Sequence, residues 1–482
     1  METKIPFDGF IGPSYQSRSS VYDCQDTINM YLEIDETGLG KNGQKAIFIG
    51  TPGLRNITTL SDQPIRAVYS VSNQTRMFII AGSTVYTTTD LLTFTQLSGS
   101  LLTSTGNIVV SDNGNQVVFV DGQYGYYIDL STITSVVNIV DDNFYPSDFV
   151  TFQDGYFIFT QTGTNIFFLS DLYTVSFLPL NQTAKTGNSD LLTAAISVNR
   201  QLYLLGKDTL EIWYNAGQSG SSPFARQDGR FSQIGCISAN SISILGEQFF
   251  WLGSNAQGGG IVYTLEGSLP KRVSTHAVEY SIQNTGTDLS TATSFAYQQE
   301  GHYFYCLNVP GLNYTWVYDM VTQQWAKRQT YANGIPNRWY AESHCVINDT
   351  HIVGDYQSGN VYILDLDYYM DNDLPKYYIR QTPHVSSNLA RVFYKLLEID
   401  FQFGIGNNDE PNPIVTLYTS SNGGKTWSNP LSVSLGKIGQ WTTRARWHRL
   451  GYARDRVFKV VITGKTKIQM LQALLDIEVG SS

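Results

Sequence analysis

Short apolar and aromatic runs, each bounded by a turn containing Gly, Asn or Asp, recur along most of the chain. Residues 76–80 and 85–87 flank one such turn, and residues 201–205 and 210–214 flank another. Runs of this length that are rich in β-branched and aromatic residues predict strands, and the short turns between them predict β-hairpins. The hydrophobic pattern therefore predicts an all-β fold.

The hairpins repeat every 40–50 residues or so across residues 64–370, roughly the length of one four-stranded propeller blade. Copies begin near Ala67, Ile108, Phe149, Ala195, Ile242, Phe295 and Cys345. One blade cannot bury both faces of its sheet, whereas a closed ring of blades does so and leaves few exposed strand edges. We therefore predict a β-propeller of about seven blades.

The two ends of the chain lack this repeat. Residues 1–63 contain Gly and Pro with little periodicity, which predicts an extended N-terminal docking segment. Residues 371–388 are polar and include two prolines, which predicts a linker. Longer strand patterns in residues 389–482 predict a β-sandwich-like domain.

Composition narrows the classes of function. The net charge is -10 and only 15% of residues are charged, which argues against a tight nucleic-acid binder that relies on Lys and Arg. No apolar run is long enough to predict a membrane span, so we expect a soluble protein. The cysteines lie far apart and predict neither a disulfide framework nor a zinc site.

Three local patterns suggest chemistry only weakly. Gly424-Lys425-Thr426 lacks the earlier glycine and following helix of a phosphate-binding loop. Residues 421–427 are close to an Asp-box, a structural turn, with Asn in place of Asp. His344 and Cys345 are neighbours on a predicted strand and point to opposite faces. We therefore predict no enzyme activity and no cofactor, and we assign no catalytic, cofactor-binding or metal-ligating residue.

Positive charge is concentrated near the C-terminus of this otherwise acidic chain. The candidate docking residues are Arg444, Arg446, Trp447, Arg449, Arg454 and Arg456. This pattern is typical either of a solvated strand face or of a patch that contacts an acidic partner subunit or nucleic-acid phosphates. Because an aromatic residue is interleaved with the arginines, we favour docking of a protein partner over DNA contact.

Several segments resemble a known family when taken in order. Residues 28–32 (INMYL) and 48–54 (FIGTPGL) resemble the opening of the packaged-DNA stabilisation proteins, the tail hub or nozzle proteins of short-tailed bacteriophages. Residues 446–451 (RWHRLG) resemble the end of that family, and residues 316–319 (WVYD) fit its blade pattern. The order of these motifs along the chain carries the resemblance.

The resemblance implies a structural virion protein, made in the host cytoplasm and located in the phage tail. It implies a homo-oligomeric ring, typically a hexamer, that helps retain packaged DNA and forms part of the DNA-ejection channel. The implied partners are the portal-adaptor ring, tail fibre or needle proteins and, transiently and without specificity, the phage genomic DNA.

Two alternatives remain at this point. The first is a carbohydrate- or receptor-binding propeller, which the aromatic content would suit. The second is a propeller glycoside hydrolase, which would need a pair of acids at a central pocket. The Asp-box-like turn is the sequence feature that favours the hydrolase.

Overall fold

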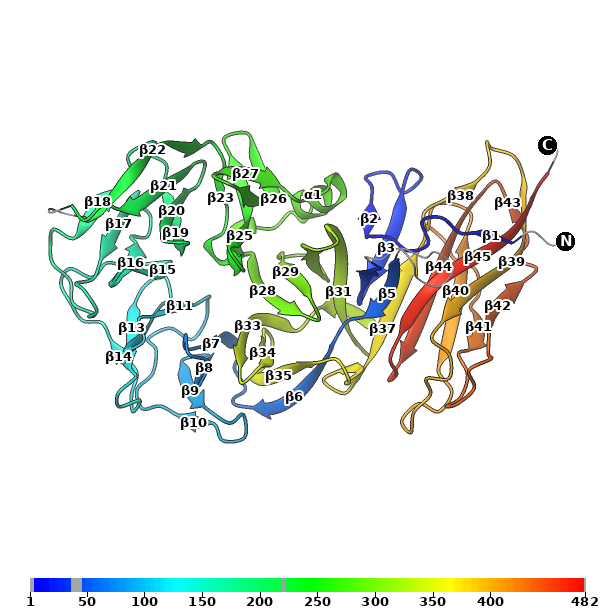
Figure 1. The fold of residues 1–482 in the computed structure, drawn as a ribbon, viewed down its shortest axis with the longest axis horizontal. Helices are drawn as coiled ribbons and strands as arrows, with labels where there is room; N and C mark the ends of the chain where they lie inside the picture. The colour runs from blue at the N-terminus through cyan, green and yellow to red at the C-terminus, as the bar shows by residue number, and fades with distance from the viewer. Residues whose placement is uncertain (1–3, 36–45, 219, 221, 481–482) are drawn as a thin grey trace.

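The computed structural model describes residues 4–35, 46–218, 220 and 222–480. The fold is nearly all-β, with 52% strand and 3% helix. Within the described ranges, the one α-helix is α1 (His276–Gln283), accompanied by short 3-10 turns at Ala239–Ser241 and Leu289–Thr291. Figure 1 shows a propeller on the left and a sandwich on the right, with N-terminal strands between them. The predicted fold class is confirmed.

The propeller contains seven blades. Blade 1 is β7 (Ile65–Ser70), β8 (Met77–Ala81), β9 (Thr84–Thr88) and β10 (Thr95–Gln96); blade 2 is β11 (Val109–Asp112), β12 (Gln116–Val120), β13 (Gly125–Asp129) and β14 (Val137–Asn138). Blade 3 is β15 (Val150–Gln153), β16 (Tyr156–Thr160), β17 (Ile166–Leu169) and β18 (Gln182–Ala184); blade 4 is β19 (Leu192–Val198), β20 (Gln201–Gly206), β21 (Leu210–Asn215) and β22 (Phe224–Ser232). Blade 5 is β23 (Gly235–Cys236), β24 (Ser243–Leu245), β25 (Gln248–Asn255), β26 (Gly258–Glu266) and β27 (Leu269–Arg272); blade 6 is β28 (Thr293–Gln299), β29 (His302–Asn308), β30 (Thr315–Asp319) and β31 (Gln324–Ala332).

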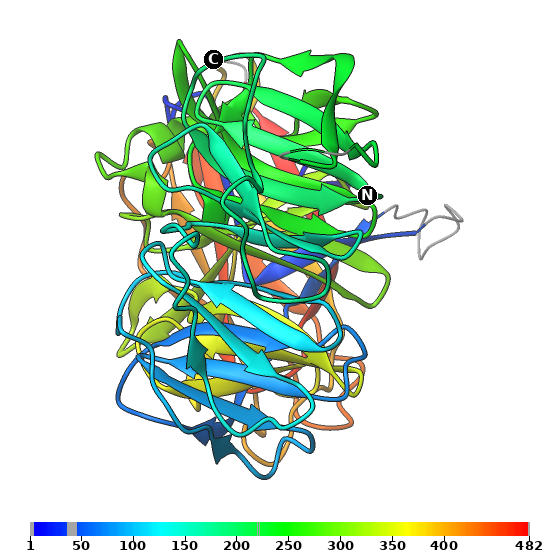
Figure 2. The same cartoon turned by 90° about the vertical axis from the view of Figure 1, so that its left-hand side faces the viewer.

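The last blade combines strands from two distant parts of the chain. β33 (Ala341–Ile347), β34 (Thr350–Asp355) and β35 (Asn360–Asp365) are completed by β6 (Gly53–Thr59), which pairs antiparallel with β35. The inner strand β33 also packs beside β7 of blade 1, so the ring closes (Figure 1). Figure 2 shows the propeller from its outer side, with the cyan and green blades facing the viewer. The segment expected to dock from outside therefore contributes a strand to the propeller. A single strand without a hairpin partner in sequence carries no repeat signal, which is why the sequence pattern did not reveal it.

The sandwich contains two sheets. The first has the order β4 (Met30–Ile34), β5 (Ala46–Gly50), β45 (Gln469–Val479), β39 (Val392–Phe401) and β42 (Ala445–His448), with β1 (Ile5–Pro6) on β45 and β43 (Tyr452–Ala453) on β39. The second runs β3 (Cys24–Ile28), β37 (Leu374–Gln381), β44 (Asp455–Gly464), β40 (Ile414–Ser420) and β41 (Leu431–Ser434), with β38 (Val385–Ser386) on β44. The remaining short strands are β2 (Tyr15–Gln16), β32 (Ile335–Arg338) and β36 (Met370–Asp371). Phe48, Tyr394 and Phe458 pack in the core between the two sheets.

The segment expected to be a linker, residues 371–388, contains the eight-residue strand β37. Its buried side chains alternate along the strand at Lys376, Tyr378 and Arg380. Two of these three are charged, so the period of two is present in burial but absent from hydrophobicity. A polar sequence thus occupies a central position between β3 and β44.

Closure of the ring by β6 generates a prediction about stability. Leu54 on β6 is 0% exposed, and we expect Leu54→Ala to lower the free energy of unfolding by about 2–5 kcal/mol because it leaves a cavity in the last blade. Urea unfolding of the purified chain measures this change. Leu92→Ala, at a residue 86% exposed, is the matched control and should shift it little. Equal effects of the two variants would show that β6 does not hold the ring closed.

Candidate functional site

The N-terminal segment joins the propeller to the sandwich. Its strand β3 pairs antiparallel with β37 of the sandwich, with Thr27 opposite Arg380, and Ile28 bridges to Lys327 on β31 of blade 6. Strands β4 and β5 then enter the sandwich, and β6 returns to the propeller. We call the region formed by β3, β4, β31 and β37 the domain joint (Figure 1).

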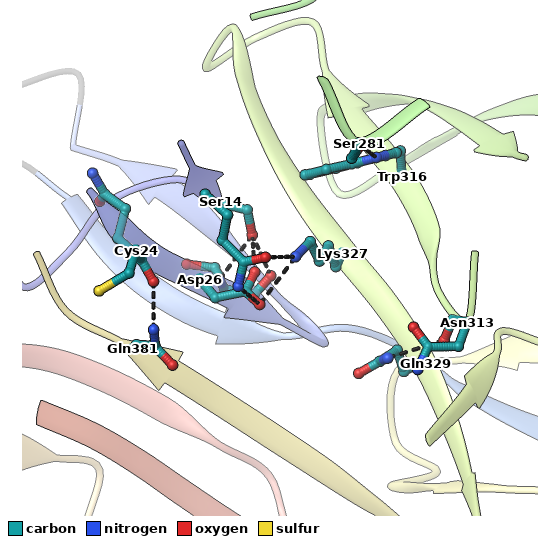
Figure 3. A network of polar contacts seen from close by, with 12 residues as sticks. Ser14, Cys24, Asp26, Ser281, Asn313, Trp316, Lys327, Gln329 and Gln381 are labelled. Atoms are coloured by element: carbon teal, nitrogen blue, oxygen red, sulfur yellow. Dashed lines mark hydrogen bonds and ion pairs between the residues drawn. The ribbon is translucent and has the colours of Figure 1, made fainter. Parts of the chain in front are cut away.

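A buried ion pair lies at the centre of the domain joint. Lys327 Nζ is 3.1 Å from Asp26 Oδ2, while Ser14 Oγ donates to Asp26 Oδ1 at 2.8 Å (Figure 3). The Lys327 ammonium also donates to Gln16 Oε1 and lies 4.4 Å from the centre of the Tyr314 ring. Both charges are nearly excluded from water, so removal of either one would leave the other buried without its counter-charge. This pair therefore ties the N-terminal segment to blade 6.

Arg380 ties the same segment to the sandwich. Its fully buried guanidinium donates to Thr27 Oγ1 at 2.9 Å and to several backbone carbonyl oxygens. These carbonyls belong to Gly9, Phe10, Gly12 and Pro13, at 2.7–3.2 Å. Burial lowers the pKa of Arg380 to about 9, yet its donors are matched by acceptors. Arg380 thus supplies the donors that a neighbouring β-strand would otherwise offer to the backbone carbonyls of residues 9–13.

Two histidines clamp the N-terminal segment at its edges. His302 Nδ1 is 2.8 Å from Asp319 Oδ2, and its Nε2 is 2.9 Å from Glu33 Oε2 on β4. Burial opposes protonation of His302, but the hydrogen bonds that the protonated ring donates to the two carboxylates outweigh this effect and raise the pKa. His384 is held in a similar way, with Nδ1 2.7 Å from Asp455 Oδ2 and Nε2 2.8 Å from the Ser20 carbonyl oxygen.

The predicted docking residues separate into two groups. Trp447 is buried in the sandwich core and its Nε1 donates to the Leu431 carbonyl. Arg456 is also buried and donates to the carbonyls of Leu450 and Tyr452. These two side chains support the fold and do not reach the surface. The other four, Arg444, Arg446, Arg449 and Arg454, are exposed or half-buried.

Three cations surround one carboxylate beside the exposed arginines. Glu398 is 2.5 Å from Lys4 Nζ, 2.9 Å from Arg446 Nε and 3.7 Å from Arg444 Nη1. Burial would raise the pKa of Glu398, but the hydrogen bonds from Lys4 and Arg446 lower it. A groove of about 610 Å³ adjoins this cluster, with Trp441, 68% exposed, on its lining. The cluster thus carries surplus positive charge next to an exposed aromatic ring.

The inner strands of the propeller line a central cavity of about 560 Å³. Glu342 is the one carboxylate among its lining residues, and it accepts hydrogen bonds from Thr293 and Arg338. Arg66 at the rim donates to backbone carbonyls, including that of Gly106 at 2.7 Å. Among the residues that the structure describes, no group of three or more His, Cys, Asp or Glu side chains is placed to hold a metal ion. No helix in the described ranges has the length and apolar character needed to cross a membrane.

Family comparison agrees with this two-domain architecture. The model described as "Bacteriophage P22 Gp10, beta-propeller" matches residues 3–369, and the model described as "Bacteriophage P22 Gp10, beta-sandwich" matches residues 377–478. These matches define a structural protein of a phage tail. The chain belongs to the bacteriophage P22 Gp10 family, the tail hub or nozzle proteins of short-tailed phages, which confirms the resemblance seen in the sequence.

Similarity to other solved structures is distant. A computationally designed protein, Ika8, is 12% identical at a TM-score of 0.39, over 65% of this chain and 99% of that one. A virginiamycin B lyase from Staphylococcus aureus is 9% identical at a TM-score of 0.44, over 64% of this chain and 97% of that one. The N-terminal domain of Nup159 is 12% identical at a TM-score of 0.43, over 70% of this chain and 98% of that one. No curated protein matches the chain.

The clamp on His302 predicts a pH dependence. Because the pKa of His302 is raised in the folded protein, protonated His302 stabilises the fold. This contribution to the free energy of unfolding is fully present below the ordinary histidine pKa near 6.5, and it is lost as the pH rises through the raised pKa of the folded state. In a plot of unfolding free energy against pH, we expect His302→Gln to lack the decrease that this histidine causes in the wild-type protein. The control His276→Gln alters a side chain that is 80% exposed and should leave the profile unchanged. Parallel profiles for wild type and His302→Gln would contradict the clamp.

Proposed function

We propose that this chain is a subunit of the tail nozzle ring of a short-tailed phage, that it helps retain packaged DNA, and that it forms part of the DNA-ejection channel. The observation that carries the proposal is the pair of family models, which match both domains in order. In this proposal the protein resides in the virion tail and assembles as a hexameric ring. Its neighbours are the portal-adaptor ring and the tail fibre or needle proteins.

The charge of the molecule supports a conduit more than a DNA-binding role. The net charge is -10, and only 15% of the residues are charged. Phosphates passing such a surface release few counterions and meet mild repulsion, so contact with the genome is transient and independent of sequence. Retention of DNA then depends on a closed passage and not on affinity for the duplex.

The exposed arginines supply a docking surface in this proposal. Arg444, Arg446 and Arg449 lie on or beside the edge strand β42, and Arg454 follows the short strand β43. In this proposal they contact an acidic surface of a neighbouring tail subunit. Trp441 offers an aromatic anchor beside them. The buried ion pair and Arg380 at the domain joint hold this surface in a fixed position relative to the propeller.

The central cavity of the propeller favours a structural role over hydrolysis. Hydrolysis of a glycoside commonly needs two carboxyl groups on either side of the scissile bond. The lining residues supply Glu342 alone, and that side chain is bound to Arg338 and Thr293. We therefore propose that the protein is not an enzyme.

The proposal can be tested with phage particles produced in a host that supplies the chain in trans. With wild-type protein, we expect about six copies per tail, as a ring, and genomes that resist nuclease. Particles lacking the chain should leak their DNA. Arg444→Glu with Arg449→Glu should abolish incorporation while the purified variant keeps its unfolding free energy, since both side chains are exposed.

The matched control is Arg200→Glu with Arg230→Glu, which changes the same charge at exposed residues of the propeller. That variant should enter particles normally. Wild-type protein absent from the tail, or DNA retained without it, would overturn the proposed function. Normal incorporation of Arg444→Glu with Arg449→Glu would overturn the docking surface alone.

A further inference from the structure

A second cavity, of about 320 Å³, lies where the propeller, the N-terminal strands and the sandwich meet. The residues that matter most in its lining are Tyr31, Glu300, Asp367, Tyr369, Tyr378 and Lys467. Tyr31 comes from β4 and Tyr378 from β37, whereas Glu300 lies in the turn between β28 and β29 and Asp367 follows β35. The cavity is separate from the central cavity of the propeller and from the groove beside Glu398.

One residue in the lining of this cavity has an unsatisfied polar group. Tyr378 is fully buried, and its hydroxyl has no hydrogen-bond partner. Buried hydroxyls almost always find a partner, so an orphaned one in a cavity wall indicates that a ligand or water completes the site. Gly50 makes room for the ring, because a Cβ there would lie 2.8 Å from Tyr378 Cε1.

The mouth of the cavity is acidic. Glu300 and Asp367 are exposed, and neither forms an ion pair with another described residue. The nearby carboxylates Asp365 and Glu33 are already paired, with Arg55 and His302. Lys467 is the one cation in the lining, so the two free carboxylates leave a negative balance.

Burial and the nearby carboxylates raise the pKa of two tyrosines in the lining. The pKa of Tyr31 is raised to about 12, first by burial and then by Glu33 and Glu300. The pKa of Tyr369 is raised by burial and then by Asp367. These phenols therefore stay neutral, and their rings face a pocket in which positive charge is favoured.

We propose that this cavity binds a small aliphatic amine in its cationic form. The ammonium group would donate to the orphaned Tyr378 Oη, lie against tyrosine ring faces and be neutralised by Glu300 and Asp367. Since the lining comes from both domains and from the N-terminal strands, the bound amine stabilises the assembled joint.

The test is calorimetric titration of the full chain with putrescine, and with 1,4-butanediol as an uncharged ligand of similar length. Putrescine should bind saturably at one site, and the diol should bind at least about tenfold more weakly. Glu300→Gln with Asp367→Asn should weaken putrescine binding by at least about tenfold. Tyr378→Phe should weaken it while the unliganded protein keeps its stability, since only an unpaired hydroxyl is lost.

Glu247→Gln with Asp349→Asn removes the same charge from exposed propeller turns and should leave the affinity unchanged. An equal loss in this control would show that putrescine responds only to net charge and would overturn the site. Equal binding of the diol and putrescine would overturn the cationic class. No saturable binding at millimolar putrescine would overturn the proposal as a whole.

Discussion

The arrangement of the molecule depends on the need to pair cations that the fold removes from water. Arg380 on β37 and Lys327 on β31 are both buried, one in the sandwich and the other in the last complete blade before ring closure. A buried charge without partners would cost several kcal/mol, so each must find acceptors. Those acceptors come from one place, the first 27 residues, as Asp26, Thr27 and the carbonyls of residues 9–13.

This constraint explains the course of the N-terminal segment. Residues 9–28 lie between the two domains because their carbonyls and Asp26 are required there, after which β4 and β5 extend the sandwich and β6 closes the propeller. The N-terminal segment is thereby fixed to two later parts of the chain, since Asp26 and Lys327 are 301 residues apart and Thr27 and Arg380 are 353 residues apart. In the function proposed above, this fixed geometry would hold the passage in the propeller and the docking surface on the sandwich in a constant relative position.

Much of the fold could be predicted from the sequence because the strands of each blade are close together along the chain. Each blade places its hairpins next to one another in sequence, so the strand and turn signals accumulate into a repeat. Strand β6 has no such neighbour, and β37 hides its period because Lys376 and Arg380 occupy buried positions. The alternation of Lys376, Tyr378 and Arg380 with less buried residues is visible only in the folded structure, because the sequence shows no matching alternation of apolar and polar residues.

The candidate site was harder to predict. The arginine-rich stretch marks real positive charge, but the sequence does not show that Trp447 and Arg456 turn inward while Arg444 and Arg446 share Glu398. The clamps on His302 and His384 join residues separated by 269 and 364 positions, and no local pattern encodes such contacts. Long-range pairing of charges is settled by packing, which is why these features emerge only in the folded structure.

The central claim is that the N-terminal segment couples the two domains into one unit. Native-state hydrogen exchange of wild type and Arg380→Met, read by mass spectrometry, tests it most directly, with the exposed Arg200→Met as control. We predict that protection falls together in β3, in β37 of the sandwich and in β31 of the propeller. Loss of protection confined to residues 9–28, with β31 and β37 unchanged, would contradict the coupling.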